Sequence, residues 1–255
     1  MNANDLLKNI FETKKVVDDL GNEYELNSNL DEKEGEFLKK IIRENKPKNT
    51  IEVGCAYGIS SLFICSELEK NKNVSHTIID PFQSSDWKNI GITNLKKANV
   101  NFFNIIEKPS EIALPQLLEK QIKYDFAFID GWHTFDHTLI DFFYLNRLIN
   151  IGGIIVIDDV GLPGINKLMR YLLNYPSYKM IGNVEINVTK QREIFDLFFK
   201  LPFYIMSKIL PMKIKYEIFA SKVIKSDKKL KLKSSMIALQ KISNDDRPWH
   251  WFKEF

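Results

Sequence analysis

Two short apolar stretches of this chain end in carboxylates, and this feature restricts the possible fold more than any other. The stretch 126–129 is followed by Asp130, and the stretch 154–157 is followed by Asp158 and Asp159. Strands that are apolar on both faces are typical of a parallel sheet covered by helices. In open α/β folds, ligands bind at the carboxyl ends of such strands. The pattern therefore predicts three carboxylates at the ligand-binding edge of a buried parallel sheet.

A regular alternation of strands and helices extends this prediction along the chain. Strand-like stretches lie at 50–54, 75–80, 100–106, 124–130 and 154–158, and stretches of helical periodicity follow them. This rhythm is that of consecutive βαβ units, so we expect five parallel strands in an α/β fold. Two more strand-like stretches, 178–188 and 234–242, follow near the C-terminus.

The chain divides into four segments by pattern. We expect an N-terminal helical cap (1–48), the α/β core (49–188), a helical insert (189–233), and a last strand with an aromatic tail (234–255). Pro202 and Pro211 divide the insert into short helices. Its apolar residues recur at helical spacing: Ile194, Leu197, Phe198, Leu201, Ile205 and Ile209. The insert could be a substrate lid, a dimer surface or an interfacial membrane helix, and the basic stretch 222–233 reads as a solvated turn.

Composition and cysteine content limit the class of protein. A hydrophobic fraction of 44% and a charged fraction of 27% are ordinary for a folded globular chain. The net charge of +3 is too small to indicate a nucleic-acid or membrane partner. Cys55 and Cys65 form no disulfide framework, and the N-terminus shows neither a signal peptide nor a transmembrane segment. We therefore expect a cytoplasmic protein, and the abundance of Lys, Asn, Ile and Phe suggests a bacterial source.

The first strand-to-helix turn and the end of the next strand together predict an adenosine ligand. Gly54 and Gly58 lie in that turn, where the absence of a side chain lets a ligand approach the backbone. Asp80 ends the next strand, where an acid accepts hydrogen bonds from ribose hydroxyls. Ala56 stands where the middle glycine of nicotinamide-binding enzymes would be. The turn therefore disfavours hydride transfer.

These motifs resemble those of a known superfamily. The stretch 52–58 resembles the first motif of the class I S-adenosylmethionine (SAM) dependent methyltransferases, and 79–81 resembles the second. The stretches 129–141, 151–153 and 158–159 are similar to a branch that includes metal-dependent sugar O-methyltransferases of macrolide biosynthesis. The resemblance implies a Rossmann-like, doubly wound, seven-stranded sheet that is mostly parallel with an antiparallel last strand. It implies a set of SAM-binding residues: Glu52, Gly54, Tyr57, Gly58, Ser60, Asp80, Phe82, Ser110 and Asp130.

The resemblance also implies a reaction, namely methyl transfer from SAM to a hydroxyl of a small molecule, which we expect to be a sugar or a sugar-containing intermediate. Asp130, Asp158 and Asp159 would bind Mg²⁺, since hard divalent cations prefer oxygen ligands. His133 follows Asp130 by three residues, which is the position of the general base in the enzymes that this segment resembles. Asp130 and His133 are thus the expected catalytic residues.

Other interpretations of the same residues remain open. The acids could simply cap a helix and end a strand, and His133 with His137 has the spacing of two zinc ligands but no third partner nearby. The tail at 246–252 could line an acceptor pocket or pin the C-terminus to the core. Neither cysteine follows a proline, and Asp80-Pro81-Phe82 is not an amino-methylation motif, so nucleic-acid methylation is disfavoured.

Two other functions also fit parts of the pattern. One is a non-catalytic SAM-fold or membrane-peripheral binding protein, which would use the apolar insert. The other is a nicotinamide-dependent oxidoreductase. A homo-oligomer is compatible with each of these functions.

Overall fold

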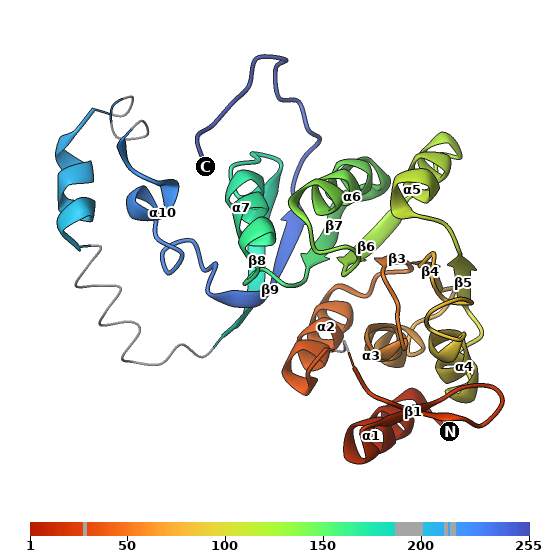
Figure 1. Ribbon diagram of the computed structural model, residues 1–255. Helices are drawn as coiled ribbons and strands as arrows, with labels where there is room; N and C mark the ends of the chain where they lie inside the picture. Colours follow the sequence, from red (N-terminus) through yellow and green to blue (C-terminus); the bar gives the residue numbers. More distant parts are fainter. Residues whose placement is uncertain (28–29, 187–200, 212–213, 215–217) are drawn as a thin grey trace.

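The computed structural model describes residues 1–27, 30–186, 201–211, 214 and 218–255 (Figure 1). Its centre is a seven-stranded sheet in the order β5-β4-β3-β6-β7-β9-β8. The strands are β3 (Asn49–Val53), β4 (Ser75–Ile79), β5 (Phe103–Ile106), β6 (Tyr124–Ile129), β7 (Ile149–Ile157), β8 (Tyr178–Glu185) and β9 (Ser234–Lys241). The first five are parallel, and β9 runs antiparallel to both β7 and β8. The predicted fold class is confirmed.

Helices cover both faces of this sheet (Figure 1). They are α2 (Glu32–Asn45), α3 (Ile59–Leu68) and α4 (Ile90–Lys97) on one face, and α5 (Ser110–Glu119), α6 (Phe135–Leu148) and α7 (Pro163–Leu172) on the other. Strand side chains alternate between these layers. Ile51 and Val53 pack in the core under α5, α6 and α7, whereas Glu52 points to the α3 side, where it is fully buried.

The N-terminal segment adds an outer layer to the α3 face. Helix α1 (Ala3–Thr13) packs on α3 and α4, and a hairpin of β1 (Lys15–Val17) and β2 (Glu23–Glu25) follows it. The sequence pattern predicted a purely helical cap, and this hairpin was not predicted. Its strands have three residues each, too few for a periodic pattern, and its loop is held by Asp18, which accepts bonds from Leu20, Asn22 and Tyr24.

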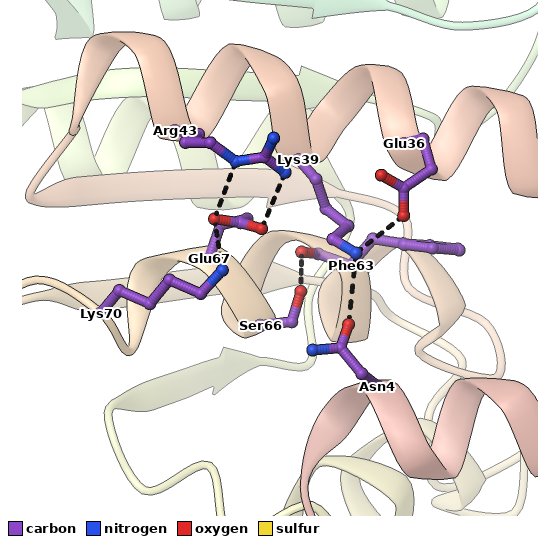
Figure 2. Close-up of polar contacts among 8 residues, drawn as sticks. All are labelled: Asn4, Glu36, Lys39, Arg43, Phe63, Ser66, Glu67 and Lys70. Atoms are coloured by element: carbon purple, nitrogen blue, oxygen red, sulfur yellow. Dashed lines mark hydrogen bonds and ion pairs between the residues drawn. The ribbon is translucent and has the colours of Figure 1, made fainter.

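Polar contacts between α2 and α3 fasten the outer helices to the core (Figure 2). The Glu67 carboxylate, almost fully buried on α3, accepts from Arg43 Nη2 at 3.0 Å and lies 2.8 Å from Lys70 Nζ. On α2, Lys39 contacts Glu36 and donates to Asn4 of α1. Burial raises the pKa of Glu67, but the hydrogen bonds from Arg43 and Lys70 outweigh burial and hold this pKa below its ordinary value of 4.5.

We predict that Glu67→Gln lowers the free energy of unfolding by about 1–2 kcal/mol at pH 7, because two charge-assisted hydrogen bonds are weakened. A depressed carboxyl pKa stabilises the fold above the ordinary value of 4.5, and this stabilisation is lost as the pH falls through the lower folded-state value. Urea unfolding should therefore show a smaller difference in unfolding free energy between the variant and the unmodified chain at pH 3.5 than at pH 7. Glu36→Gln is the matched control and should change little, because the Glu36 carboxylate is exposed. A pH-independent loss in Glu67→Gln would contradict the assigned ion pair.

The C-terminal part contains the helical insert and the tail. Residues 201–209, including Pro202, are helical and α10 (Ser221–Ile224) follows, while 187–200 lie outside the described residues. Trp251 lies on Tyr175 with ring centroids 5.8 Å apart, and the Arg247 guanidinium lies 3.5 Å from the Tyr175 ring centroid. Trp249, in contrast, is 96% exposed. Of the two interpretations of the tail, the contacts favour pinning to the core. No helix in the described ranges is long and apolar enough to cross a bilayer.

Candidate active site

A cavity of about 690 Å³ opens at the carboxyl ends of β3, β4 and β6. This is the edge at which the sequence predicted the ligand, and most of the predicted cofactor residues line it. These are Gly54, Tyr57, Ser60, Asp80, Phe82, Ser110 and Asp130. The proposed base His133 lines it too, whereas Glu52, Gly58, Asp158 and Asp159 do not.

The turn after β3 brings two strand ends into direct contact. Gly54 has φ +89°, and a Cβ there would stand 2.0 Å from the Asp130 carbonyl oxygen. The Gly54 amide donates to the Ile79 carbonyl, and the Asp130 amide donates to the Val53 carbonyl, both at 2.9 Å. Gly54 thus lets the ends of β3, β4 and β6 meet around the cavity. Gly58 has φ +77° and packs against Gly91, so it shapes the turn without facing the cavity.

Asp80 is bound to the turn as well as to the cavity. Its Oδ2 accepts from the amides of Cys55 and Ala56 at 3.1 and 2.9 Å and from Gln83 Nε2 at 2.9 Å. Its Oδ1 accepts from the Phe82 amide at 2.9 Å. A carboxylate oxygen has two lone pairs, so Oδ1 keeps capacity for one further donor. The acid therefore fixes the turn and leaves one oxygen for a ligand, a double role that the sequence analysis did not foresee.

Glu52 lies beneath the turn rather than in the cavity. Its Oε2 accepts from the Ser61 hydroxyl and lies 3.1 Å from His76 Nε2, and all three side chains are buried. The Nδ1 atom of His76 lies 2.9 Å from the Thr50 hydroxyl. A direct contact of Glu52 with the cofactor remains a prediction without support from this arrangement. The buried network instead joins β3, β4 and α3 under the turn.

The acidic residues and the histidine gather at the ends of β6 and β7. His133 Nδ1 lies 3.2 Å from Asp159 Oδ2, and His133 Nε2 lies 3.9 Å from Asp130 Oδ1. The imidazole is half exposed and sits between these two carboxylates. Asp158 is buried, and its Oδ1 has no hydrogen-bond partner. The structure thus places His133 close to Asp130 and Asp159 and turns Asp159 towards the histidine.

Burial and mutual repulsion set the charge state of the buried acids. Burial, and then the charges of Asp158, Glu52 and Asp159, raise the pKa of Asp130 well above its ordinary value. Burial, and then the charge of Glu34, raise the pKa of Asp158 to about 8. Neighbouring carboxyl groups that interact in this way ionise together only at a cost in free energy unless a positive charge lies nearby. A bound cation would supply that charge.

These donors match a divalent metal better in their chemistry than in their positions. The oxygen atoms of three carboxylates suit Mg²⁺, and the unpartnered Oδ1 of Asp158 is a free ligand atom. The positions fit less well, since within the part of the chain that the structure describes no group of three or more His, Cys, Asp or Glu side chains converges as a metal site. The chemistry of the donors fits a metal, and their convergence stays a prediction.

Aromatic side chains form part of the cavity wall; Tyr57 was predicted as a site residue, whereas Trp87 and Trp132 were not. Tyr57 and Trp87 meet edge to face with ring centroids 5.1 Å apart. Trp132 is 60% exposed beside His133, and its ring lies 6.3 Å from that of His137. A tryptophan in a loop carries no periodic signal, so only the structure reveals these contacts. Flat apolar walls of this kind suit planar ligand groups.

Behind Ser110 and Gly131, which line the cavity, lies a buried acid, Asp141 of α6. It is 1% exposed, and its Oδ1 has no hydrogen-bond partner. Burial raises the pKa of Asp141 to about 6, although a hydrogen bond with Ser110 opposes this rise. A raised carboxyl pKa means that stability is present below the ordinary value of 3.8 and is lost as the pH rises through 6.

We therefore predict that Asp141→Asn gains stability relative to the unmodified chain as the pH rises. The advantage should grow by about 1–2 kcal/mol between pH 5 and pH 7.5, because the variant carries no ionisable group at this position. Urea unfolding at the two pH values measures it. An advantage that is the same at both would show that the buried carboxyl group does not titrate in this range.

Comparisons with known proteins find similarity over the part of the chain that lines most of the cavity. Residues 51–160 match the model of a family described as a methyltransferase domain. Tapetum-specific methyltransferase 1 of Arabidopsis thaliana is 34% identical over 160 residues, covering 61% of this chain and 63% of the relative. Caffeoyl-CoA O-methyltransferase of Stellaria longipes is 31% identical over 133 residues, covering 49% and 51%. The chain thus spans between half and two thirds of the length of these relatives.

A solved structure gives the same fold. The O-methyltransferase from Bacillus cereus in complex with SAH superimposes with a TM-score of 0.57 at 17% identity, covering 69% of this chain and 82% of that chain. The matched segment 51–160 contains the glycine turn, Asp80, Asp130, His133 and both acids after β7.

Proposed function

We propose that this chain, which contains a methyltransferase domain in the fold of the class I SAM-dependent methyltransferases, transfers a methyl group from SAM to a hydroxyl of a small molecule. The main support for this function is the cavity itself. It joins the glycine turn and Asp80 with Asp130 and His133 in one space of about 690 Å³.

The cofactor would lie along the turn after β3. The free capacity of Asp80 Oδ1 suits a ribose hydroxyl, and the backbone at Gly54 leaves room for close approach. Phe82 and Ser110 line the same cavity and would meet the adenine. The methionine part would then point towards Ser60 and Asp130. This assignment explains why the residue that directly follows β3 is a glycine, Gly54.

His133 would act as the base. Its Nδ1–H can donate to Asp159 Oδ2 at 3.2 Å, which leaves Nε2 as an acceptor. During transfer, the acceptor oxygen forms a bond to the methyl carbon, the bond from that carbon to sulfur breaks, and the hydroxyl proton passes to Nε2. The products are the methyl ether and SAH. A positioned base of this kind typically contributes ~10²–10⁴-fold to the rate.

A divalent cation held by Asp130, Asp158 and Asp159 is the second part of the proposal. When bound, it would supply positive charge that makes the acceptor hydroxyl more acidic. The raised pKa values of Asp130 and Asp158 support it, because a cation would favour the ionised carboxylates. Mg²⁺ is the cation that the oxygen ligands fit.

Two classes of acceptor are compatible with the aromatic wall near His133. The sequence resemblance favours a hydroxyl on a sugar, whereas the name of the Stellaria longipes relative points to a phenolic hydroxyl. Trp132 could lie against the apolar face of either ring. We place the reaction at a ring-bound hydroxyl, and the experiment separates the two classes.

A transfer assay with methyl-labelled SAM tests the proposal. Catechol-type phenols and nucleotide sugars are offered in parallel, with Mg²⁺ and with EDTA. The proposal predicts label in at least one hydroxyl acceptor and loss of transfer in EDTA. Transfer that persists in EDTA would remove the metal and keep the base. If SAM binds and no hydroxyl compound is labelled, a non-catalytic SAM-binding protein becomes the better description.

A further inference from the structure

The helix at 201–209 carries an exposed apolar face that no described residue covers. In Figure 1 this helix lies at the far end of the molecule, beyond α7 and away from α5. Four side chains on one side of it are between 44% and 80% exposed: Leu201, Ile205, Met206 and Ile209. Ile205, Met206 and Ile209 follow Leu201 by four, five and eight residues, so the four side chains lie on one side of the helix. An apolar face of this size on a surface helix usually marks an interaction site.

The opposite side of the same helix is anchored. Ser207 is buried, and the ring of Phe203, which is half exposed, lies 6.4 Å from that of Phe219, which is buried just before α10. The helix therefore has an inner side that packs against the segment leading to α10. Its outer side faces solvent, and the side chains of Ile205 and Ile209 are therefore exposed.

The same part of the chain is strongly basic. Among its described residues from 201 to 233 there are seven lysines: Lys208, Lys222, Lys225, Lys228, Lys229, Lys231 and Lys233. The single acid among them, Asp227, pairs with Arg170 of α7. The whole chain has a net charge of only +3, so the remainder of the chain is net negative. Positive charge is thus concentrated in the part of the chain that contains the apolar face, and Lys208 lies on the same helix.

We propose that the apolar face of the helix at 201–209, together with the adjacent lysines, binds the surface of an anionic lipid bilayer. Aliphatic side chains would enter the boundary between headgroups and acyl chains, and the lysines would lie among the anionic headgroups. This combination of an apolar face with flanking lysines is the requirement for an interfacial helix. Each lysine near an anionic surface adds attraction that salt weakens. The helix would lie on the membrane and not cross it.

The positive charge of this segment favours an anionic bilayer over a second copy of the chain as the partner of the apolar face. A two-fold symmetric interface places the same surface patch on both sides, so it would bring the lysine-rich segments of two copies together. Like charges across an interface oppose association. An anionic bilayer instead complements both the apolar face and the lysines.

Vesicle sedimentation of the whole protein tests the proposal. Phosphatidylcholine vesicles are compared with vesicles that also contain phosphatidylglycerol, at low and at high salt. We expect binding to the anionic vesicles that weakens as salt increases, and little binding to the neutral ones. No binding to the anionic vesicles would overturn the proposal.

Two variants and their controls assign the binding to this surface. Ile205→Asp with Ile209→Asp should weaken vesicle binding at least tenfold, since both side chains are exposed and their exchange leaves the fold intact. Lys222→Gln, Lys229→Gln and Lys231→Gln together should weaken it tenfold to a hundredfold. The controls, which should bind as the unmodified chain does, are Leu20→Asp and the triple exchange Lys40→Gln, Lys72→Gln and Lys120→Gln.

Light scattering decides between the membrane and a second copy. The proposal predicts the same oligomeric state for the unmodified chain and for the Ile205→Asp, Ile209→Asp variant. A dimer that this variant dissociates, with unchanged vesicle binding, would overturn the proposal and make the face a subunit interface. Thermal unfolding of each variant confirms that the fold is retained.

Discussion

Gly54→Ala should weaken SAH binding at least a hundredfold. A Cβ at this position would stand 2.0 Å from the Asp130 carbonyl oxygen, far inside van der Waals contact, so the ends of β3 and β6 must separate. That movement displaces both the backbone along which the cofactor would lie and the Asp130 side chain. Calorimetric titration of SAH measures the loss.

Gly152→Ala is the matched control for this prediction. Gly152 has the same φ of +89°, but nothing lies within 4 Å of its Cβ position. Both exchanges therefore impose the same backbone strain, about 1–2 kcal/mol for a residue in the left-handed region, and only Gly54→Ala adds the clash. Both variants should lose stability in urea unfolding, and only Gly54→Ala should lose SAH. Equal SAH binding in the two would show that the turn does not form the cofactor site.

His133→Ala should lower the rate of methyl transfer by ~10²–10⁴, the typical contribution of a positioned general base, while SAH affinity stays unchanged. The imidazole lies between Asp130 and Asp159, and its loss removes the proton acceptor but none of the groups assigned to the cofactor.

Asp130→Ala should abolish transfer and weaken metal binding. Single-turnover kinetics with saturating SAM measures the first effect, and calorimetry with Mg²⁺ measures the second.

His137→Ala provides the matched control. This histidine also lines the cavity and has the same side-chain exposure of 41%, but its Nδ1 faces the Thr134 hydroxyl at 2.8 Å at the start of α6. Its loss should change the rate little. If the two histidine variants transfer methyl groups equally fast, His133 is not the base.

The sheet and its ligand-binding edge could be predicted from the sequence because their signals are local. A buried strand such as β6 is a continuous apolar stretch, and the acid that follows it must appear at the sheet edge. The register confirms this, since Val53 of β3 pairs with Ile129 of β6 and Gly54 meets Asp130 directly. Parallel strands bring their carboxyl ends together whatever the spacing along the chain.

The remaining features depend on contacts between distant residues, which a single sequence does not encode visibly. Glu52 lies in a motif, yet strand alternation turns it away from the cavity towards Ser61 and His76. Gln83 fixes Asp80 from a loop without any motif. The direction of Asp159 depends on its left-handed backbone, with φ +54°. Side-chain direction at the ends of elements was therefore the part that the sequence could not supply.

Calorimetric titration of SAM into the purified chain, in Mg²⁺ and in EDTA, measures cofactor binding directly. We expect one SAM per chain and no competition by NAD⁺, because Ala56 replaces the glycine of nicotinamide sites. Binding should persist in EDTA, since none of the groups assigned to the adenosine depends on the metal. Absence of SAM binding under both conditions, in a chain that is folded by circular dichroism, would contradict the account.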